Sequence, residues 1–188
     1  RQGEVKKTKV ELFSVVRSSG LIAMDLEDGD ELVSVSLGTD QEDVIVATQK
    51  GLSIRFAISS LRASSRTSGG VRGIRLTSGD SLVSMDKADV DAFLVVVTEG
   101  GYGKITPIVR YPRQHRGGMG VKTFHIIEKT GEIAAAKVVT LSEQLMIISA
   151  DGIVTRIPVK ERDPRKGITT QGRSTQGVRL MKLDDGDK

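Results

Sequence analysis

Short apolar runs rich in Val and Ile alternate along this 188-residue chain with turns made of Gly, Ser and Asp. Runs of this kind, bounded by turn residues, are typical of β-strands. In one part of the chain they predict strands at Val44–Thr48, Leu52–Ala57, Val71–Leu76 and Leu82–Met85. In the next part they predict strands at Phe93–Thr98, Lys104–Ile108, Val121–Ile127 and Ile133–Val138. Only Ile58–Arg62 fits a helical turn, so we expect an all-β fold.

Two glycine markers repeat in register along the chain. The first is a hairpin glycine flanked by apolar residues, with spacings of 48, 50 and 51 residues, at Gly3, Gly51, Gly101 and Gly152. The second is a glycine followed by an acid, with spacings of 50, 52 and 55 residues, at Gly29, Gly79, Gly131 and Gly186. A period of this size indicates an array of small sheets. A four-stranded unit of this length is typical of a propeller blade.

The markers divide the chain into four repeats, roughly residues 1–40, 41–90, 91–142 and 143–188. The chain begins just before the first hairpin glycine and stops just after the last Gly-acid pair. We therefore expect one array of about four blades that is incomplete at both ends, as in a fragment of a longer array.

The composition excludes several kinds of site and argues against others. The chain has no Cys, which excludes disulfides and thiolate metal sites and fits a cytosolic protein. Its apolar runs are too short to cross a membrane, and its N-terminus has no signal-peptide pattern. The net charge is +4, and only 3% of the residues are aromatic, which argues against a platform for stacking single-stranded bases.

The charges follow the repeat. No acid occurs from Val44 to Gly79 or from Gly100 to Ile127, whereas acids cluster in the segments between. In each repeat the bases fall in the second hairpin strand and the connection after it. Equivalent loops of successive blades project in the same direction, so the pattern predicts a basic belt. Such a belt suits a regularly charged polyanion such as duplex DNA. The alternative is a propeller-like scaffold that binds an acidic protein.

The segment YPRQHRGGMGVKTF, residues 111–124, surrounds three glycines with bases and contains no acid. Its glycines allow close approach to another group, and their main-chain N–H groups suit phosphate contact. It does not match a phosphate-binding Walker loop, because no Lys-Ser or Lys-Thr follows with the required spacing. It does not match a dinucleotide-binding fingerprint either, because no helix follows.

Part of this segment, QHRGGMG from Gln114 to Gly120, resembles the gyrase A box, whose usual form is QRRGGKG. Repeats such as SGGVRGIRL and ITTQGRSTQGVRLMKLDDGD resemble the C-terminal domain of DNA gyrase A along nearly the whole chain. The resemblance implies a β-pinwheel, a propeller relative in which neighbouring blades exchange strands. The sequence departs from the box at His115 and Met119, and its box lies in the third repeat rather than the first blade.

The resemblance also implies a function, which is binding and wrapping of duplex DNA. The residues expected to hold DNA at the box are Gln114, His115, Arg116, Gly117, Gly118 and Gly120. Those expected to extend the track are Arg62, Arg66, Arg72, Lys104, Arg110, Arg113, Lys122, Arg162, Arg165, Lys166 and Arg173. In the parent enzyme, ATP and Mg²⁺ would bind outside this domain. The protein partners would be the N-terminal region of gyrase A and gyrase B. The complex would be located in the bacterial cytoplasm, at the nucleoid. The corresponding domain of topoisomerase IV is the near alternative.

No catalytic set is evident in the sequence. His115 and His125 have no acidic neighbour in sequence, and Tyr102 and Tyr111 are best explained by loop packing. The acids of Asp25–Glu31 lack the spacing of a calcium-binding loop. We therefore expect no catalytic residue, no metal site and no cofactor in this domain.

Overall fold

The computed structural model describes residues 1–160, 166–184 and 186–187. The strands of the first two repeats are β1 (Glu4–Val5), β2 (Asp43–Thr48), β3 (Leu52–Ala57), β4 (Val71–Arg72) and β5 (Leu82–Lys87). Those of the last two are β6 (Phe93–Thr98), β7 (Tyr102–Pro107), β8 (Val121–Lys122), β9 (Ile133–Val139), β10 (Gln144–Ile148), β11 (Val154–Pro158) and β12 (Val178–Arg179). Three 3-10 turns lie between them: η1 (Val10–Phe13), η2 (Ile58–Ser60) and η3 (Ile108–Arg110). The fold is almost entirely β, as the sequence predicts.

The strands form antiparallel sheets that exchange strands between repeats. One sheet has the order β5-β2-β3-β8 and another has the order β12-β7-β6-β9. Strand β8 belongs to the third repeat but pairs with β3 of the second, and β12 of the fourth pairs with β7 of the third. The pair β1-β4 makes the same exchange at the first junction. The strand exchange implied by the pinwheel resemblance is therefore confirmed.

The third strand of each repeat is shorter than the sequence pattern predicts. The predicted strands covered Val71–Leu76 and Val121–Ile127, whereas β4 and β8 each contain two residues. The strands end early because the following N–H groups turn to the hairpin glycine of the preceding repeat. The Gly51 carbonyl accepts the N–H groups of Thr123 and Phe124, and the Gly3 carbonyl accepts those of the equivalent residues.

The hairpin glycine needs to be glycine for two reasons. Gly51 has a φ of 87°, a left-handed conformation that side chains disfavour. A Cβ there would also lie 2.7 Å from the carbonyl oxygen of Phe124. The repeat marker in the sequence thus records a contact between blades, and not only a tight turn.

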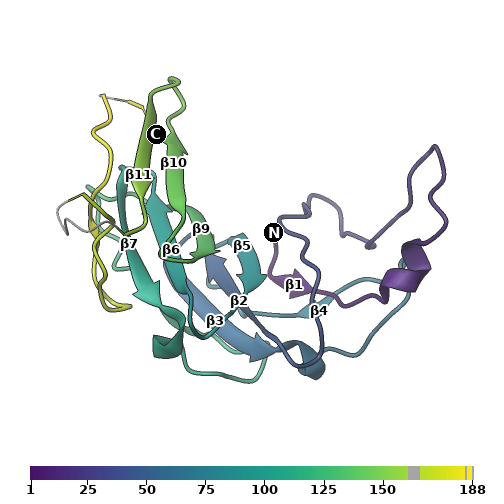
Figure 1. Ribbon diagram of the computed structural model, residues 1–188. Helices are drawn as coiled ribbons and strands as arrows, with labels where there is room; N and C mark the ends of the chain where they lie inside the picture. Colours follow the sequence, from purple (N-terminus) through teal and green to yellow (C-terminus); the bar gives the residue numbers. More distant parts are fainter. Residues whose placement is uncertain (161–165, 185, 188) are drawn as a thin grey trace.

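Apolar cores lie within and between neighbouring sheets. Val46, Ile54 and Phe56 of the second repeat and Val96 of the third are fully buried, and Leu94 of the third is almost fully buried. Figure 1 shows the sheets following one another along an open arc. The 3-10 turn η1 lies near one end of this arc, and the β10–β11 hairpin lies at the other. None of the helices among the described residues is long and apolar enough to span a membrane.

Candidate nucleic-acid interface

Three loops with equivalent positions connect the repeats. We call them the box loops: residues 64–70 (SSRTSGG), 114–120 (QHRGGMG) and 171–177 (QGRSTQG). Each one precedes a short exchanged strand, β4, β8 or β12. The first N–H of each loop donates to the hairpin of the preceding repeat, from Ser64 to Lys7 O at 2.9 Å, Gln114 to Arg55 O at 2.8 Å and Gln171 to Ile105 O at 2.9 Å. The box is therefore one member of a structural series.

A second backbone bond also repeats at each junction. It runs from Asp25 N to Ser68 O at 3.1 Å, from Arg75 N to Gly118 O at 2.8 Å, and from His125 N to Thr175 O at 3.0 Å. The donor is always in the earlier repeat and the acceptor is in the box loop of the next. Each box loop is thus bonded to the preceding repeat on two sides.

The central arginine of each box loop makes a third repeated bond. Its Nη1 donates to a backbone carbonyl of the preceding repeat, from Arg66 to Ile22 O at 3.0 Å, Arg116 to Arg72 O at 3.2 Å and Arg173 to Lys122 O at 3.4 Å. Arg116 Nε also donates to Ser60 O at 3.4 Å. These guanidinium groups therefore already have protein partners.

The glycines of the box are partly committed to the fold. The N–H of Gly117 donates to Gly73 O at 2.6 Å, so the expectation that this N–H would be open to phosphate is wrong. Gly120 has a φ of 74°, and a Cβ there would lie 2.2 Å from Ser53 O. Gly118 is exposed. The spacing of the glycines thus serves first to bring the loop against β3.

Lys104 is not at the surface, and its place in the predicted DNA track is wrong. The side chain is fully buried, and its Nζ donates to the carbonyls of Gly172, Arg173 and Thr175 at 2.6, 2.7 and 3.0 Å. It also lies over the Phe124 ring, 5.1 Å from the centroid. Burial, with a smaller effect of the Arg173 charge, lowers the pKa of Lys104 to about 7. Lys6, at the equivalent position of the first repeat, donates to Ala23, Arg66 and Ser68 carbonyls in the same way.

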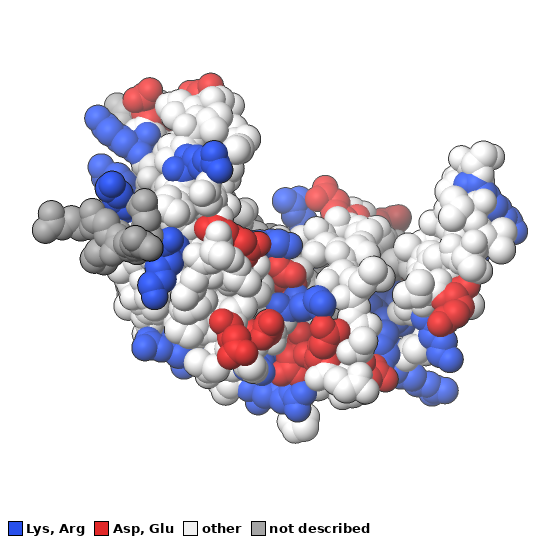
Figure 2. All heavy atoms as spheres, viewed as in Figure 1, with Lys and Arg blue, Asp and Glu red and all other residues white. Residues whose placement is uncertain are grey.

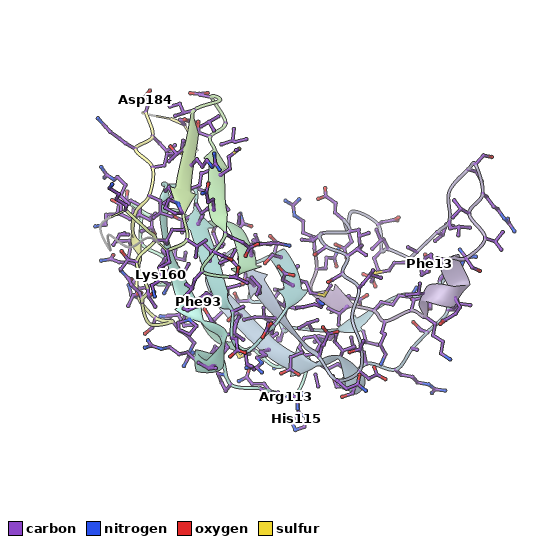
Figure 3. All side chains as sticks on the ribbon, in the orientation of Figure 1. Phe13, Phe93, Arg113, His115, Lys160 and Asp184 are labelled. Atoms are coloured by element: carbon purple, nitrogen blue, oxygen red, sulfur yellow. The ribbon has the colours of Figure 1, made fainter. Side chains whose placement is uncertain are left out.

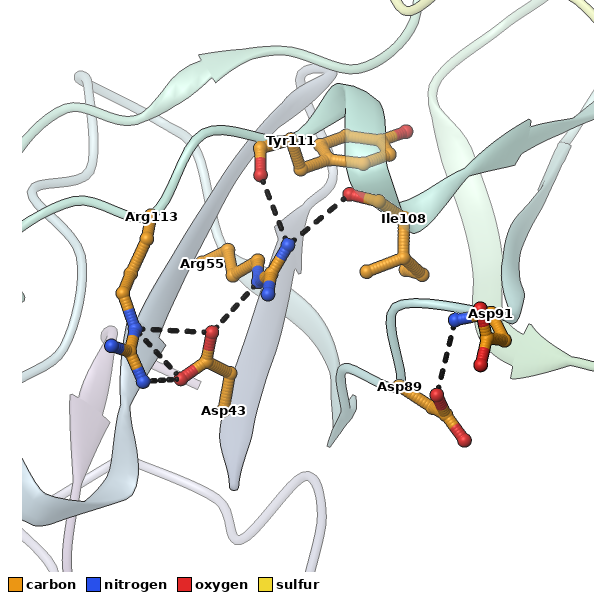
Figure 4. A network of polar contacts seen from close by, with 7 residues as sticks. All are labelled: Asp43, Arg55, Asp89, Asp91, Ile108, Tyr111 and Arg113. Carbon is orange, nitrogen blue, oxygen red and sulfur yellow. Dashed lines mark hydrogen bonds and ion pairs between the residues drawn. The ribbon is translucent and has the colours of Figure 1, made fainter. Parts of the chain in front are cut away.

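Arg113 has an acidic partner that the local sequence does not show. Asp43, 70 positions earlier, accepts from Arg113 Nε at 2.9 Å and also from Arg55 Nε at 2.9 Å (Figure 4). Arg55 Nη1 in turn reaches the carbonyls of Ile108 and Tyr111 at 3.5 and 3.4 Å. The bond to Asp43 and its charge raise the pKa of Arg113. The segment 111–124 contains no acid of its own, but the fold brings Asp43 of the preceding repeat beside it.

Several predicted bases are exposed, and others join them. The exposed members of the predicted set are Arg62, Arg72, Arg110, Arg113, His115, Arg116, Lys122 and Lys166. Gln114, Arg66 and Arg173 are half-buried. Arg162 and Arg165 lie outside the described residues. Arg75, Arg179 and Lys182 were not in the predicted track, although all three are exposed.

The added residues complete two rows. Arg72, Lys122 and Arg179 each follow a Gly-Val pair at the start of an exchanged strand, and Arg75, His125 and Lys182 follow them by three positions. The Gly-Val-base pattern was the signal available in the sequence. Figure 2 shows many Lys and Arg side chains along the outer edge of the arc, with several acids near the middle of the visible face. In Figure 3 the side chain of His115 projects from the lower edge of the molecule, close to Arg113.

Among the described residues, no three His, Cys, Asp or Glu side chains come together to hold a metal. Tyr111 is buried, its hydroxyl lies 2.7 Å from that of Thr123, and burial raises its pKa. Packing thus explains this tyrosine, as the sequence indicated. Tyr102 is half-buried, with Lys129 and Arg179 over its ring.

Comparison with known proteins gives consistent results. The family model described as "DNA gyrase C-terminal domain, beta-propeller" matches residues 1–37, 42–89, 92–140 and 143–188. The DNA gyrase A protein of Dehalogenimonas lykanthroporepellens is 48% identical over 186 residues, which cover 99% of this chain and 23% of that protein. The DNA gyrase A protein of Staphylococcus epidermidis is 42% identical over 188 residues, which cover 99% of this chain and 20% of that protein. The chain therefore spans about a fifth of the curated relatives that it matches.

Two solved structures share the fold. The C-terminal domain of DNA topoisomerase IV superposes with a TM-score of 0.88 at 23% identity, over 97% of this chain and 55% of that one. The DNA gyrase A C-terminal domain superposes with a TM-score of 0.85 at 24% identity, over 99% of this chain and 60% of that one. At this level of identity the superpositions establish the architecture alone.

Proposed function

Since the chain belongs to the DNA gyrase C-terminal domain family, we propose that it binds duplex DNA along the outer edge of its arc, largely independently of sequence. The observation that carries this proposal is the row formed by Arg72, Lys122 and Arg179, one exposed base per junction. Duplex DNA carries a phosphate charge about every 1.7 Å of its axis, and releasing its counterions drives binding. A row that repeats with the blades can follow such a polyanion.

The contacts that we propose are mostly electrostatic. The exposed bases Arg62, Arg110 and Lys166 would extend the row, and Gln114, His115 and Gly118 would face DNA at the box loop. Arg66, Arg113, Arg116 and Arg173 add positive potential to the edge while their guanidinium groups hold protein partners. Arg162 and Arg165 would belong to the same track. Because the edge is curved, bound DNA would bend with little reading of its bases.

The domain itself would be non-catalytic and without a cofactor. Its role would be to wrap DNA for a parent enzyme that introduces negative supercoils with ATP and Mg²⁺, in the bacterial cytoplasm at the nucleoid. Its protein partners would be the rest of gyrase A and gyrase B. The similarity to DNA gyrase A proteins of two bacteria supports this assignment.

The salt dependence of binding tests the proposal. Two duplexes of unrelated sequence should bind with similar affinity, and the logarithm of the binding constant should fall linearly with the logarithm of salt concentration. Each lost phosphate contact lowers the slope by about 0.9. As a control, Lys137→Ala removes a base that is already paired with Asp86 at 3.1 Å, so the slope should not change. Weak, salt-insensitive DNA binding together with saturable binding of an acidic protein would instead establish the scaffold.

A further inference from the structure

The bond from the central arginine of each box loop has a specific acceptor. Ile22, Arg72 and Lys122 are each the second residue after a glycine, in Gly20-Leu21-Ile22, Gly70-Val71-Arg72 and Gly120-Val121-Lys122. The arginines therefore reach the same backbone atom at three successive junctions. A contact that repeats at every junction belongs to the way the blades are joined.

Two of the three acceptor residues, Arg72 and Lys122, also carry proposed phosphate contacts. Arg72 gives its carbonyl to Arg116 and exposes its own side chain, and Lys122 gives its carbonyl to Arg173 and does the same. The neighbouring bonds from Gly117 N to Gly73 O and from Arg75 N to Gly118 O hold the backbone on the other side of Arg72. The box loop of one repeat thus fixes the base of the repeat before it.

Arginine suits this task because its planar guanidinium offers several donors in a fixed geometry. Arg116 uses Nη1 for Arg72 O and Nε for Ser60 O, which are two separate points of the second repeat. A lysine at this position would keep the charge, but its single ammonium on a flexible stem would not hold the same two carbonyls in fixed directions.

We propose that Arg66, Arg116 and Arg173 are positioning residues, which set the angle between successive blades and hence the path of bound DNA. The phosphate contacts are made by Arg72, Lys122 and Arg179. This inference rests on the proposed function, since it assigns separate roles to the residues of the DNA-binding edge. A positioning residue and a phosphate ligand have different signatures, because the first changes the shape of the complex and the second changes its counterion release.

Two variants of the protein separate these roles. Lys122→Ala should lower the salt slope by about 0.9, the loss of one phosphate contact, and should keep the linking-number shift per bound molecule on ligated circular plasmid. Arg116→Lys should keep the salt slope and should lose part of that linking-number shift. Arg173→Lys, at the next junction, should repeat the effect of Arg116→Lys.

The Arg→Lys variants keep the positive charge, so they separate the positioning role of these arginines from their charge. The inference is overturned if Arg116→Lys and Arg173→Lys wrap DNA like the wild type, and a salt slope lowered by about 0.9 in Arg116→Ala would then identify Arg116 as a phosphate ligand. Circular dichroism and a thermal melt establish that each variant is folded. If Arg116→Lys does not fold, Arg173→Lys decides the test at the neighbouring junction, and an unchanged linking-number shift there overturns the inference. Failure of the wild type to bind duplex DNA would instead refute the proposed function.

Discussion

Asp43 at the start of β2 and Arg113 beside the box loop form an ion pair that joins the second repeat to the third, with Arg113 Nε 2.9 Å from Asp43 Oδ1. The Asp43 side chain is only 5% exposed, whereas that of Arg113 is 58% exposed. Arg55 binds the other carboxylate oxygen at 2.9 Å, so one acid restrains two bases. At the first and third junctions the box loop is held by a lysine of the preceding repeat, Lys6 or Lys104. The second repeat has Ile54 at the position of these lysines, so the middle junction lacks this contact.

Replacing Asp43 tests how this pair balances stability against DNA binding. Asp43→Asn should destabilise the protein by about 1.5–3 kcal/mol, the usual cost of losing hydrogen bonds to a charged group. It should also steepen the salt slope of DNA binding by up to about 0.9, because Arg113 becomes available to a phosphate. Urea unfolding and binding titrations measure the two effects.

Asp40→Asn is the matched control for Asp43. Asp40 is 62% exposed and pairs with Lys7 at 2.6 Å, and exposed pairs contribute about 1 kcal/mol or less. Both measurements should therefore change little. An unchanged or shallower salt slope in Asp43→Asn would show that Asp43 does not withhold Arg113 from DNA.

The lowered pKa of Lys104 predicts a pH dependence of stability. In the unfolded chain this lysine binds its proton up to its ordinary pKa of 10.5, whereas in the folded protein it releases the proton near pH 7. Between these values the unfolded state binds more protons, so the contribution of Lys104 to the free energy of unfolding rises with pH from about 7 to 10.5. Below pH 7 the charged, buried form costs stability in full.

The comparison with Lys104→Met isolates this effect, because Met removes the titrating group and keeps an apolar stem. Relative to this variant, the wild type should gain stability steadily between about pH 7 and 10, by at most about 1.4 kcal/mol per pH unit. A difference that stays constant over this range would show that the carbonyls of Gly172, Arg173 and Thr175 keep the ammonium charged.

Two glycines of the box loop should respond differently to alanine. Gly120→Ala places a Cβ 2.2 Å from Ser53 O at a φ of 74°, so we expect a loss of about 1–3 kcal/mol in the free energy of unfolding. Gly118→Ala meets no atom closer than 3.6 Å and should stay within about 0.5 kcal/mol of the wild type. Equal effects of the two substitutions would contradict the close docking of this loop on β3.

Local patterns in the sequence predicted the strands well. The predicted strand Leu52–Ala57 is β3 itself, and the helical turn predicted at Ile58–Arg62 is η2 (Ile58–Ser60). The periods of apolar and turn residues suffice here because these elements form from neighbouring residues. The third strands were predicted too long, because their length depends on the carbonyls of Gly3 and Gly51 in another repeat.

Features that depend on contacts between repeats could not be predicted from local sequence patterns. The sequence places Lys104 in the DNA track because it shows the charge of this residue but not the carbonyls of Gly172 and Thr175 that bind its ammonium. The pairing of Arg113 with Asp43 joins residues 70 positions apart, and no local pattern marks it. Alignment of the repeats on their Gly-Val pairs would have revealed Arg179 and Lys182, because they repeat Arg72 and Arg75.

The most direct test of the central claim is topological. The protein is bound at low salt to nicked circular plasmid, the nick is ligated, the protein is removed, and the linking-number distribution is read on a gel. If the exposed bases of successive blades guide DNA around the arc, the distribution shifts with a constant sign and in proportion to the bound protein. Demonstrable binding without any shift would contradict the claim that this chain wraps DNA.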